Sequence, residues 1–185
     1  RVREEKGLEL VFGALARLNE GGVRAGFLII GGGSAIGGLQ RLSEQIGVPT
    51  HFAGPIYGEE DLAVMLCASR VVVAPEAVGL TAVHAMSYGV PVVTHSDFDD
   101  QRPEAEAIIP GLTGNFFKPG DEAELARTLS PFLGPNDLRE LWEPSCTRMI
   151  SQWYNPKRMR QTFDRAVNGL PAEQLDVWPR LEQGR

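Results

Sequence analysis

Short apolar runs that suit buried strands alternate along this chain with stretches that suit amphipathic helices. Apolar runs occupy 25–30, 71–73 and 90–93, and a turn-forming or polar segment follows each run. This alternation predicts βαβ units, in which parallel strands form a sheet with helices on both faces. We therefore expect an α/β fold whose ligands bind outside the carboxyl ends of its strands.

The first helix shows the pattern most clearly, because Leu8, Val11, Phe12, Leu15 and Leu18 recur at spacings of three and four. Strands are predicted at 25–30, 49–53, 71–73, 90–94 and 113–117, and further helices at 36–46, 59–67, 79–88, 121–132, 136–152 and 156–168. No linker interrupts residues 1–168, which we predict to be one domain followed by a C-terminal tail, 169–185.

Composition and charge limit the classes of partner. The chain has 185 residues, 43% of them hydrophobic, and a formal net charge of −6. An acidic chain is a poor general binder of nucleic acid, so no nucleic-acid partner is expected. No apolar run reaches the length of a membrane span and no secretory signal is recognisable, so we expect a cytoplasmic protein. Cys67 and Cys146 lie far apart, outside any paired motif, and are predicted to be buried thiols in a reducing compartment.

Residues 31–34 (Gly-Gly-Gly-Ser) follow the first predicted strand. Gly31 and Gly33 would let the backbone approach a phosphate group, with Ser34 capping the next helix. The segment does not complete a dinucleotide-binding fingerprint, because Ile36 stands where that pattern has its last glycine. A plain turn between a strand and a helix is the alternative.

Residues 75–86 are the most informative segment, because a strand there runs through a turn into a helix. The backbone amides of Val78, Gly79, Leu80 and Thr81 are predicted to form an anion site at the N-terminus of this helix. Glu76 precedes that helix at the mouth of the expected cleft. An acid that merely favours a helix N-terminus is the alternative for Glu76.

His84, one to two turns into the same helix, has two interpretations. It is either a ligand-binding side chain or a hydrogen-bonded packing histidine.

The order of motifs resembles that of the group-1 nucleotide-sugar glycosyltransferases, enzymes of two Rossmann-like domains in the B-type fold. Arg1 and Lys6-Gly7 are similar to the family's opening motif, and 76–93 is similar to its E-x7-E region and the following Pro-Val-Val. The segments 106–114 and 119–121 resemble its later Gly-x-x-Gly and Pro-Gly-Asp run. The resemblance covers about residues 1–133 and implies one half of such an enzyme, the donor-binding domain.

The resemblance also implies roles for individual residues. Arg1 and Lys6 would hold the donor diphosphate together with the amides of 78–81, with no metal or other cofactor required. Glu76 would be the catalytic carboxylate that contacts the donor sugar, and His84 and Ile56 would lie near the ribose and the base. Two solvated charges are the alternative interpretation of Arg1 and Lys6.

The implied partners are a nucleotide-sugar donor, a glycan, lipid or small-molecule acceptor, and an N-terminal acceptor-binding domain. The reaction would transfer a hexosyl group with retention, as in polysaccharide or cell-envelope biosynthesis.

The sequence departs from the family pattern at several places. His84 stands where the family has its second Glu, which usually binds ribose hydroxyls. Residues 97–104 replace a glycine-rich loop, and the acids there would repel an anionic donor group whereas Arg102 would attract one. The family's N-terminal domain and the strand before Arg1 lie outside this sequence.

Two rival functions follow from these departures. One is a non-catalytic nucleotide-binding or interaction module, and the other is a sugar-nucleotide epimerase of the same architecture. The basic patch of residues 157–160 with Arg165 suggests contact with another domain or a peripheral site on the inner membrane face, and a solvated face is its alternative.

Overall fold

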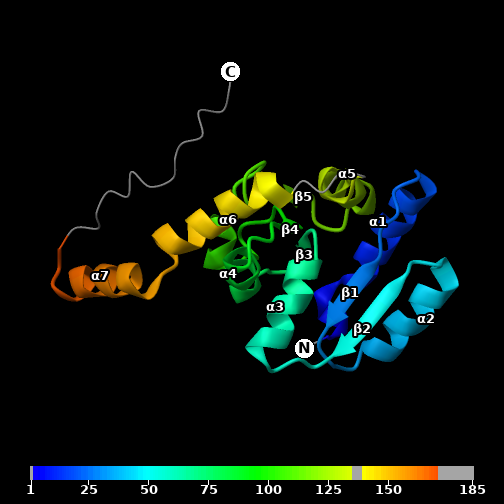
Figure 1. Ribbon diagram of the computed structural model, residues 1–185, viewed down its shortest axis with the longest axis horizontal. Helices are drawn as coiled ribbons and strands as arrows, with labels where there is room; N and C mark the ends of the chain where they lie inside the picture. Colours follow the sequence, from blue (N-terminus) through cyan, green and yellow to red (C-terminus); the bar gives the residue numbers. More distant parts are fainter. Residues whose placement is uncertain (1, 135–138, 171–185) are drawn as a thin grey trace, which may run out of the picture.

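The computed structural model describes residues 2–134 and 139–170 and has the expected α/β architecture (Figure 1). The strands are β1 (Phe27–Ile30), β2 (Thr50–Gly54), β3 (Val72–Ala74), β4 (Val92–His95) and β5 (Gly114–Phe117). The α-helices are α1 (Leu8–Glu20), α2 (Ile36–Ile46), α3 (Glu59–Ala68), α4 (Leu80–Ser87), α5 (Glu122–Leu133), α6 (Arg139–Trp153) and α7 (Pro156–Val167). The short 3-10 helices η1 (Glu4–Lys6) and η2 (Pro103–Ala107) were not predicted from the sequence.

All the predicted strands and helices are present, with ends that differ by a few residues where they can be compared. The start predicted for the helix at 136 and most of the predicted tail lie outside the described residues. Ser34 does not cap α2, because Ala35 occupies the N-cap position and no side chain caps the helix.

The strands form two parallel sheets instead of one. β1 pairs with β2, while β3, β4 and β5 form a second sheet in that order. Within the described residues no strand hydrogen-bonds β1 to β3, so both strands leave one edge unpaired. Parallel pairing inside each sheet agrees with the prediction, but the division between β1 and β3 was not foreseen.

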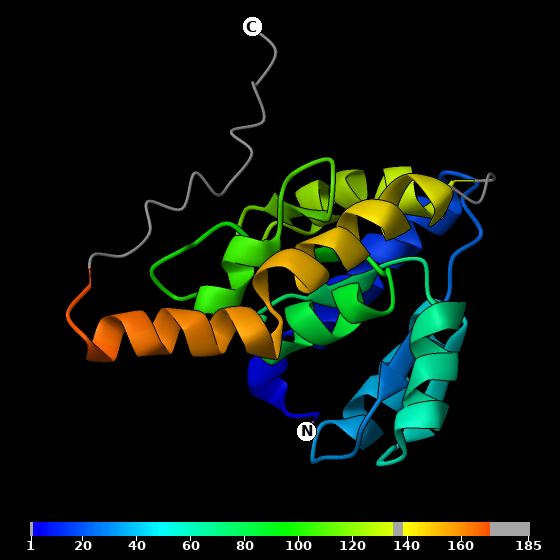
Figure 2. The ribbon, with the colours of Figure 1, turned by 60° about the vertical axis from the view of Figure 1, so that its left-hand side comes forward.

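Helices cover both faces of this split sheet and enclose two apolar clusters. One cluster joins α1 to β1, α2 and α5 and includes the fully buried Phe12, Leu39 and Leu125. The other lies on α4, η2 and α6 and includes Met86 and Cys146. Figure 2 shows α4 and α6 in front, with α1 behind them. Because α1 packs against both α2 and α5, it connects the two sheets by packing where no strand pairing does.

Packing at the start of β5 explains why glycine occupies position 114, which belongs to one of the motifs of the family resemblance. A Cβ on Gly114 would lie 1.8 Å from the backbone oxygen of Val92, which no packing adjustment can accommodate cheaply. Thr113 closes the same turn, since its hydroxyl donates to Ala107 and accepts from the Ile109 amide, both at 2.7 Å. This segment therefore fixes the pairing of β5 with β4.

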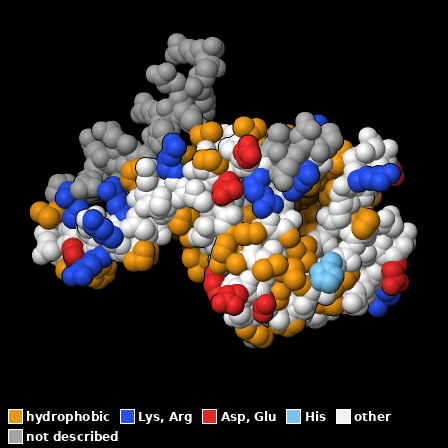
Figure 3. Space-filling model, in the orientation of Figure 1, with side chains coloured by type: hydrophobic (Ala, Val, Ile, Leu, Met, Phe, Trp, Pro, Cys, Tyr) orange, Lys and Arg blue, Asp and Glu red, His pale blue; other side chains and the backbone are white. Residues whose placement is uncertain are grey.

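The C-terminal helix α7 extends beyond the body of the domain (Figure 1) and has no buried residue. Met159, Phe163 and Val167 are each more than 60% exposed at spacings of four. Basic side chains gather on the same helix (Figure 3), namely Lys157, Arg158, Arg160 and Arg165. No helix in the described part of the chain is long and apolar enough to cross a membrane.

The two cysteines differ in environment. Cys146 is fully buried, and burial raises the pKa of its thiol to about 12. Cys67 is exposed, so the prediction that both thiols are buried was wrong for Cys67. A residue on the outer face of α3 was mistaken for a core residue because α3 is apolar on more than one side.

Candidate functional site

The opening segment of the chain and the turn after β3 meet at the carboxyl end of the second sheet. A Cβ on Gly7 would lie 3.0 Å from Glu76 Oε1 and 3.5 Å from Pro75 Cβ, and Gly7 has φ of +59°. Both constraints favour glycine, so the backbone at Gly7 is placed directly against Glu76. Lys6 lines the same cavity as Glu76, Val78 and Thr81, whereas Arg1 lies outside the described residues, so the meeting of the two cations with this turn stays a prediction.

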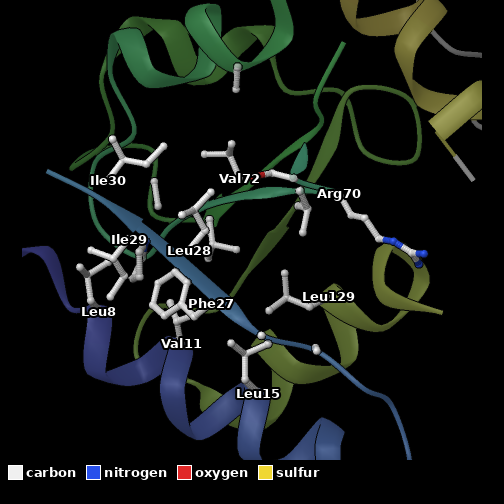
Figure 4. Close-up of a pocket in the computed structure, with 18 of the residues that line it drawn as sticks. Leu8, Val11, Leu15, Phe27, Leu28, Ile29, Ile30, Arg70, Val72 and Leu129 are labelled. Carbon is white, nitrogen blue, oxygen red and sulfur yellow. The ribbon is translucent and has the colours of Figure 1, made fainter. Parts of the chain in front are cut away.

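A cavity of about 1040 Å³ runs between β1 and β3 (Figure 4). Most of its lining residues are apolar and lie inside the fold, and they come from α1, β1, β3 and α5, for example Val11, Leu28, Val72 and Leu129. A nucleotide diphosphate does not suit such a lining, because an unpaired charge is costly to bury. The polar end of the cavity is different, and it is lined by Lys6, Glu76, Val78, Thr81 and His84.

The first turn of α4 presents backbone amides at this polar end. The first N–H groups of a helix have no intrahelical partner, and no side chain caps α4 at Gly79. The Val78 amide is different, because it donates to Gln101 Oε1 at 3.0 Å. Of the amides predicted to bind phosphate, Val78 therefore already has a partner, which leaves those of Gly79, Leu80 and Thr81. The side chain of Arg102 passes beside Gly79, since its Cγ lies 3.8 Å from a Cβ built there.

Thr94 and Gln101 hold this turn in place, and the sequence analysis missed both. The fully buried Thr94 hydroxyl donates to the backbone oxygens of Ala74 at 2.7 Å and Glu76 at 3.2 Å. Gln101 donates to Thr94 Oγ1 at 2.8 Å and to the His95 oxygen at 3.1 Å. A polar residue at the end of an otherwise apolar strand was the only sequence signal for Thr94.

His84 is held by neighbouring side chains. Its Nε2 lies 3.2 Å from Glu59 Oε1, and its ring lies beside that of Tyr88. The Tyr88 hydroxyl also donates to Glu59. The hydrogen bond from Tyr88 and, to a smaller extent, the one with His84 lower the pKa of the Glu59 carboxyl. Glu59 reaches this position from the start of α3, so a carboxylate lies close to where the family has its second Glu, but on another helix.

The glycines after β1 accommodate the opening segment. A Cβ on Gly33 would lie 1.9 Å from the Val2 oxygen, and one on Gly31 would lie 3.3 Å from the Val2 side chain. The Val2 amide donates to the Gly32 oxygen at 3.0 Å. The close approach seen at these glycines is therefore made by this chain's own backbone, and a donor-binding role for Gly31 and Gly33 stays a prediction.

Ile56 lies half-buried in the loop between β2 and α3, at the carboxyl end of β2. Its predicted position near the base likewise remains a prediction.

A third group of side chains gathers beside Glu76. One ligand atom from each of Glu76, His95 and Asp100 lies within 4.8 Å of the other two. His95 is the last residue of β4 and is only 3% exposed, whereas the Asp100 side chain is 68% exposed. Asp100 is one of the acids of residues 97–104 that the sequence analysis set against an anionic donor group, but its meeting with His95 was not predicted.

Parallel strands with helices on both faces, and a cation and helix amides at their carboxyl ends, define the class of α/β domains that bind phosphorylated ligands. Residues 1–147 match the family model described as "Glycosyl transferases group 1". The chain belongs to this family of group-1 glycosyltransferases. No protein with a curated description matches the sequence.

Solved structures show the same fold at low sequence identity. The lipopolysaccharide outer core galactosyltransferase WaaB, solved without ligand, matches 89% of this chain with a TM-score of 0.70 and 20% identity. HepE of Anabaena, solved with UDP and glucose, matches 92% with a TM-score of 0.73 and 20% identity. TarM of S. aureus, solved with UDP, matches 88% with a TM-score of 0.73 and 17% identity.

These matches involve only part of each structure. The chain covers 45% of WaaB, 47% of HepE and 32% of TarM. At this identity the likeness establishes the fold alone.

Proposed function

We propose that this chain is the donor-binding domain of a retaining glycosyltransferase that moves a hexosyl group from a nucleoside diphosphate to a hydroxyl acceptor. The observation that carries the proposal is that Gly7 lies against Glu76 and that Lys6, Glu76 and Thr81 line the same cavity at the first turn of α4. A leaving diphosphate gains negative charge as the glycosidic bond breaks. An ammonium group and helix amides stabilise that charge, so no metal ion or other cofactor is required.

Each residue at this edge has a proposed role. Lys6 and, next to Gly79, Arg102 would neutralise the diphosphate, with Arg1 as a further cation. Glu76 would act as the catalytic carboxylate beside the sugar and stabilise the cationic transition state. His84 and the Glu59 carboxylate that it contacts would bind the ribose hydroxyls, and Ile56 would contact the base.

The proposal includes an N-terminal acceptor-binding domain. The gap between the unpaired edges of β1 and β3, which the cavity described above occupies and which we call the slot, supports it. Both facing edges have unpaired backbone groups, and the side chains between them are apolar. Such edges are stabilised when a further strand pairs with them. The Val2 amide donates to Gly32 and the Val2 oxygen accepts from Ala35, a pattern close to that of a parallel pair. A segment entering at Arg1 would therefore run beside β1 in the parallel sense and fill the slot.

Helix α7 supplies a second surface for that domain. Its exposed Met159, Phe163 and Val167, with basic neighbours, suit either the N-terminal domain or an anionic membrane surface. We propose a cytoplasmic enzyme with such a peripheral contact. The acceptor, whether glycan, lipid or small molecule, would bind between the two domains.

Calorimetric titration of the full chain with UDP and with GDP tests the proposal. One of the two is expected to bind, and Lys6→Ala is expected to weaken that binding at least about tenfold, the loss typical of a charge-assisted phosphate contact. Lys157→Ala on α7 is the matched control and should change nothing. Absence of heat and of any thermal shift at millimolar nucleotide would contradict the proposal.

A non-catalytic nucleotide-binding module is the second candidate, and the engagement of the Val78 amide by Gln101 favours it. The two candidates differ in turnover. Transfer or hydrolysis of a nucleotide-sugar, once an N-terminal domain is joined to the chain, would exclude the module. Epimerised free sugar formed without an acceptor would instead indicate an epimerase.

A further inference from the structure

His95 carries a buried nitrogen that has no partner. Its Nδ1 accepts a hydrogen bond from the Asp97 amide at 3.2 Å, which leaves the proton of the neutral ring on Nε2. Nε2 is buried and without a hydrogen-bond partner among the described residues. Asp100 Oδ2, at 3.9 Å, is too far away to accept from it. A buried donor without an acceptor is destabilising, so an acceptor from beyond the described residues would stabilise this one.

The neighbours of this nitrogen define what that acceptor is. Asp100 Oδ2 lies 3.9 Å from it, and a Glu76 carboxylate oxygen lies within 4.8 Å of a ring nitrogen of His95; both carboxylates offer oxygens that only accept hydrogen bonds. An anion would be repelled by both carboxylates. A metal ion would need a lone pair on Nε2, and the Asp97 amide holds the ring in the tautomer that has none. A hydroxyl group both donates and accepts, and adjacent hydroxyls satisfy all three side chains at once.

We propose that Glu76, His95 and Asp100 form a subsite for adjacent hydroxyl groups of an uncharged sugar, with His95 Nε2–H as its fixed donor. The inference rests on the proposed function and adds to it the class of sugar. Because the subsite has two carboxylates and one neutral donor, it selects a neutral hexose over a uronate. His95 and Asp100 thereby act as specificity residues beside Glu76.

Binding of UDP, UDP-glucose and UDP-glucuronate to the full chain tests this inference, with the GDP series used if GDP is the nucleotide that binds. The native protein is expected to prefer the glucose donor to both the free nucleotide and the glucuronate. His95→Phe keeps an aromatic ring without the N–H and should weaken UDP-glucose about tenfold while leaving UDP unchanged. His95→Gln, whose amide nitrogen also donates, should restore most of the loss.

Substitutions of exposed side chains should leave the fold intact, so they test the inference without the risk that the variant fails to fold. Asp100→Ala should reduce UDP-glucose affinity several-fold and relax the discrimination against UDP-glucuronate. Asp99→Ala, on the same exposed loop, is the control and should match the native protein.

Deoxygenation of one sugar hydroxyl should remove the effect of His95→Phe, since the two changes delete the same hydrogen bond. A loss that no single deoxygenation removes would contradict the inference.

Three further results would overturn the subsite alone: UDP-glucose bound no tighter than UDP, equal losses for both ligands in His95→Phe, or Mn²⁺ or Zn²⁺ binding that depends on His95. Failure of both UDP and GDP to bind the native chain would instead contradict the proposed function.

Discussion

β4 (Val-Val-Thr-His) is less apolar than β1 (Phe-Leu-Ile-Ile), yet it is the more deeply buried of the two strands. All four residues of β4 are buried, whereas only Ile29 is buried in β1. β4 has a strand on each side, but β1 has one neighbour and faces the slot on its other edge. β3, on the far side of the slot, is likewise only partly buried. The comparison teaches that the number of paired neighbours, and not the hydrophobicity of the strand, sets its burial here.

The largest expected effect comes from filling the slot. An extension of four or five apolar β-branched residues before Arg1 should raise the free energy of unfolding by about 4 kcal/mol, since burying each such side chain contributes about 1.5–3 kcal/mol before ordering costs. Chemical denaturation measures the change. The same extension with a central proline is the control and should give no gain, because proline cannot pair with both edges. Equal stability of the two extended chains would mean that the slot does not accept a strand.

A substitution in the complete sheet should be costly. Gly114→Ala forces a Cβ onto the Val92 backbone and is expected to lower the free energy of unfolding by about 3 kcal/mol. Gly38→Ala in α2 is the matched control, because a Cβ there meets nothing within 4 Å. It should stabilise the protein by about 0.5–1 kcal/mol. Similar denaturation midpoints for both variants would contradict the packing described for β4 and β5.

Glu76 lies after β3, at the carboxyl end of the second sheet. Glu76→Gln should reduce turnover at least about 10²-fold in the enzyme completed by its N-terminal domain. The reason is that the carboxylate would stabilise charge that develops only in the transition state. Nucleotide affinity, measured by calorimetry, should be nearly unchanged. A parallel loss of affinity and turnover would place Glu76 in ground-state binding.

The Glu59–His84 pair offers a smaller effect. His84→Ala and Glu59→Gln should each weaken nucleotide binding several-fold, because each removes part of the proposed ribose contact. Since hydrogen bonds lower the pKa of Glu59, its contribution to stability is present above its ordinary pKa and is lost as the pH falls through the lowered value. Melting curves below pH 5 should show less acid sensitivity in Glu59→Gln. Unchanged nucleotide affinity in both variants would identify His84 as a packing residue.

The smallest expected effect involves Cys146. Because burial raises the pKa of its thiol to about 12, the unfolded chain ionises first as the pH rises above about 9. Stability should therefore fall between pH 9 and 12, by about 1 kcal/mol at pH 10. Cys146→Ala should not show this loss of stability at alkaline pH. A thiol reagent should modify the exposed Cys67 in the native state and leave Cys146 intact, and rapid labelling of both would contradict the burial.

Local sequence patterns predicted the helices and strands because hydrophobic periodicity is a property of neighbouring residues. The 3.6-residue stripe of α1 and the apolar runs of β1, β3 and β4 each indicate one element without reference to the rest of the chain. Strand pairing depends on residues far apart, so the alternation predicted parallel sheets but not the division between β1 and β3.

The candidate site likewise has features that local sequence patterns predicted and features that they did not. Glu76 and the turn at Gly79 were predictable, since glycine and acid positions around a helix start are local signals. The partnership of Glu59 with His84, the hold of Gln101 on Val78, and the meeting of His95 with Asp100 were not.

By itself, the sequence determined the order of elements and the parallel α/β class and predicted the edge at which a ligand would bind, because each follows from patterns of a few adjacent residues. Only the tertiary structure decided which side chains meet at that edge and which backbone edges stay unpaired. The physical reason is that a hydrogen bond or a buried orphan nitrogen depends on ångström-scale distances between segments that are separate in the chain.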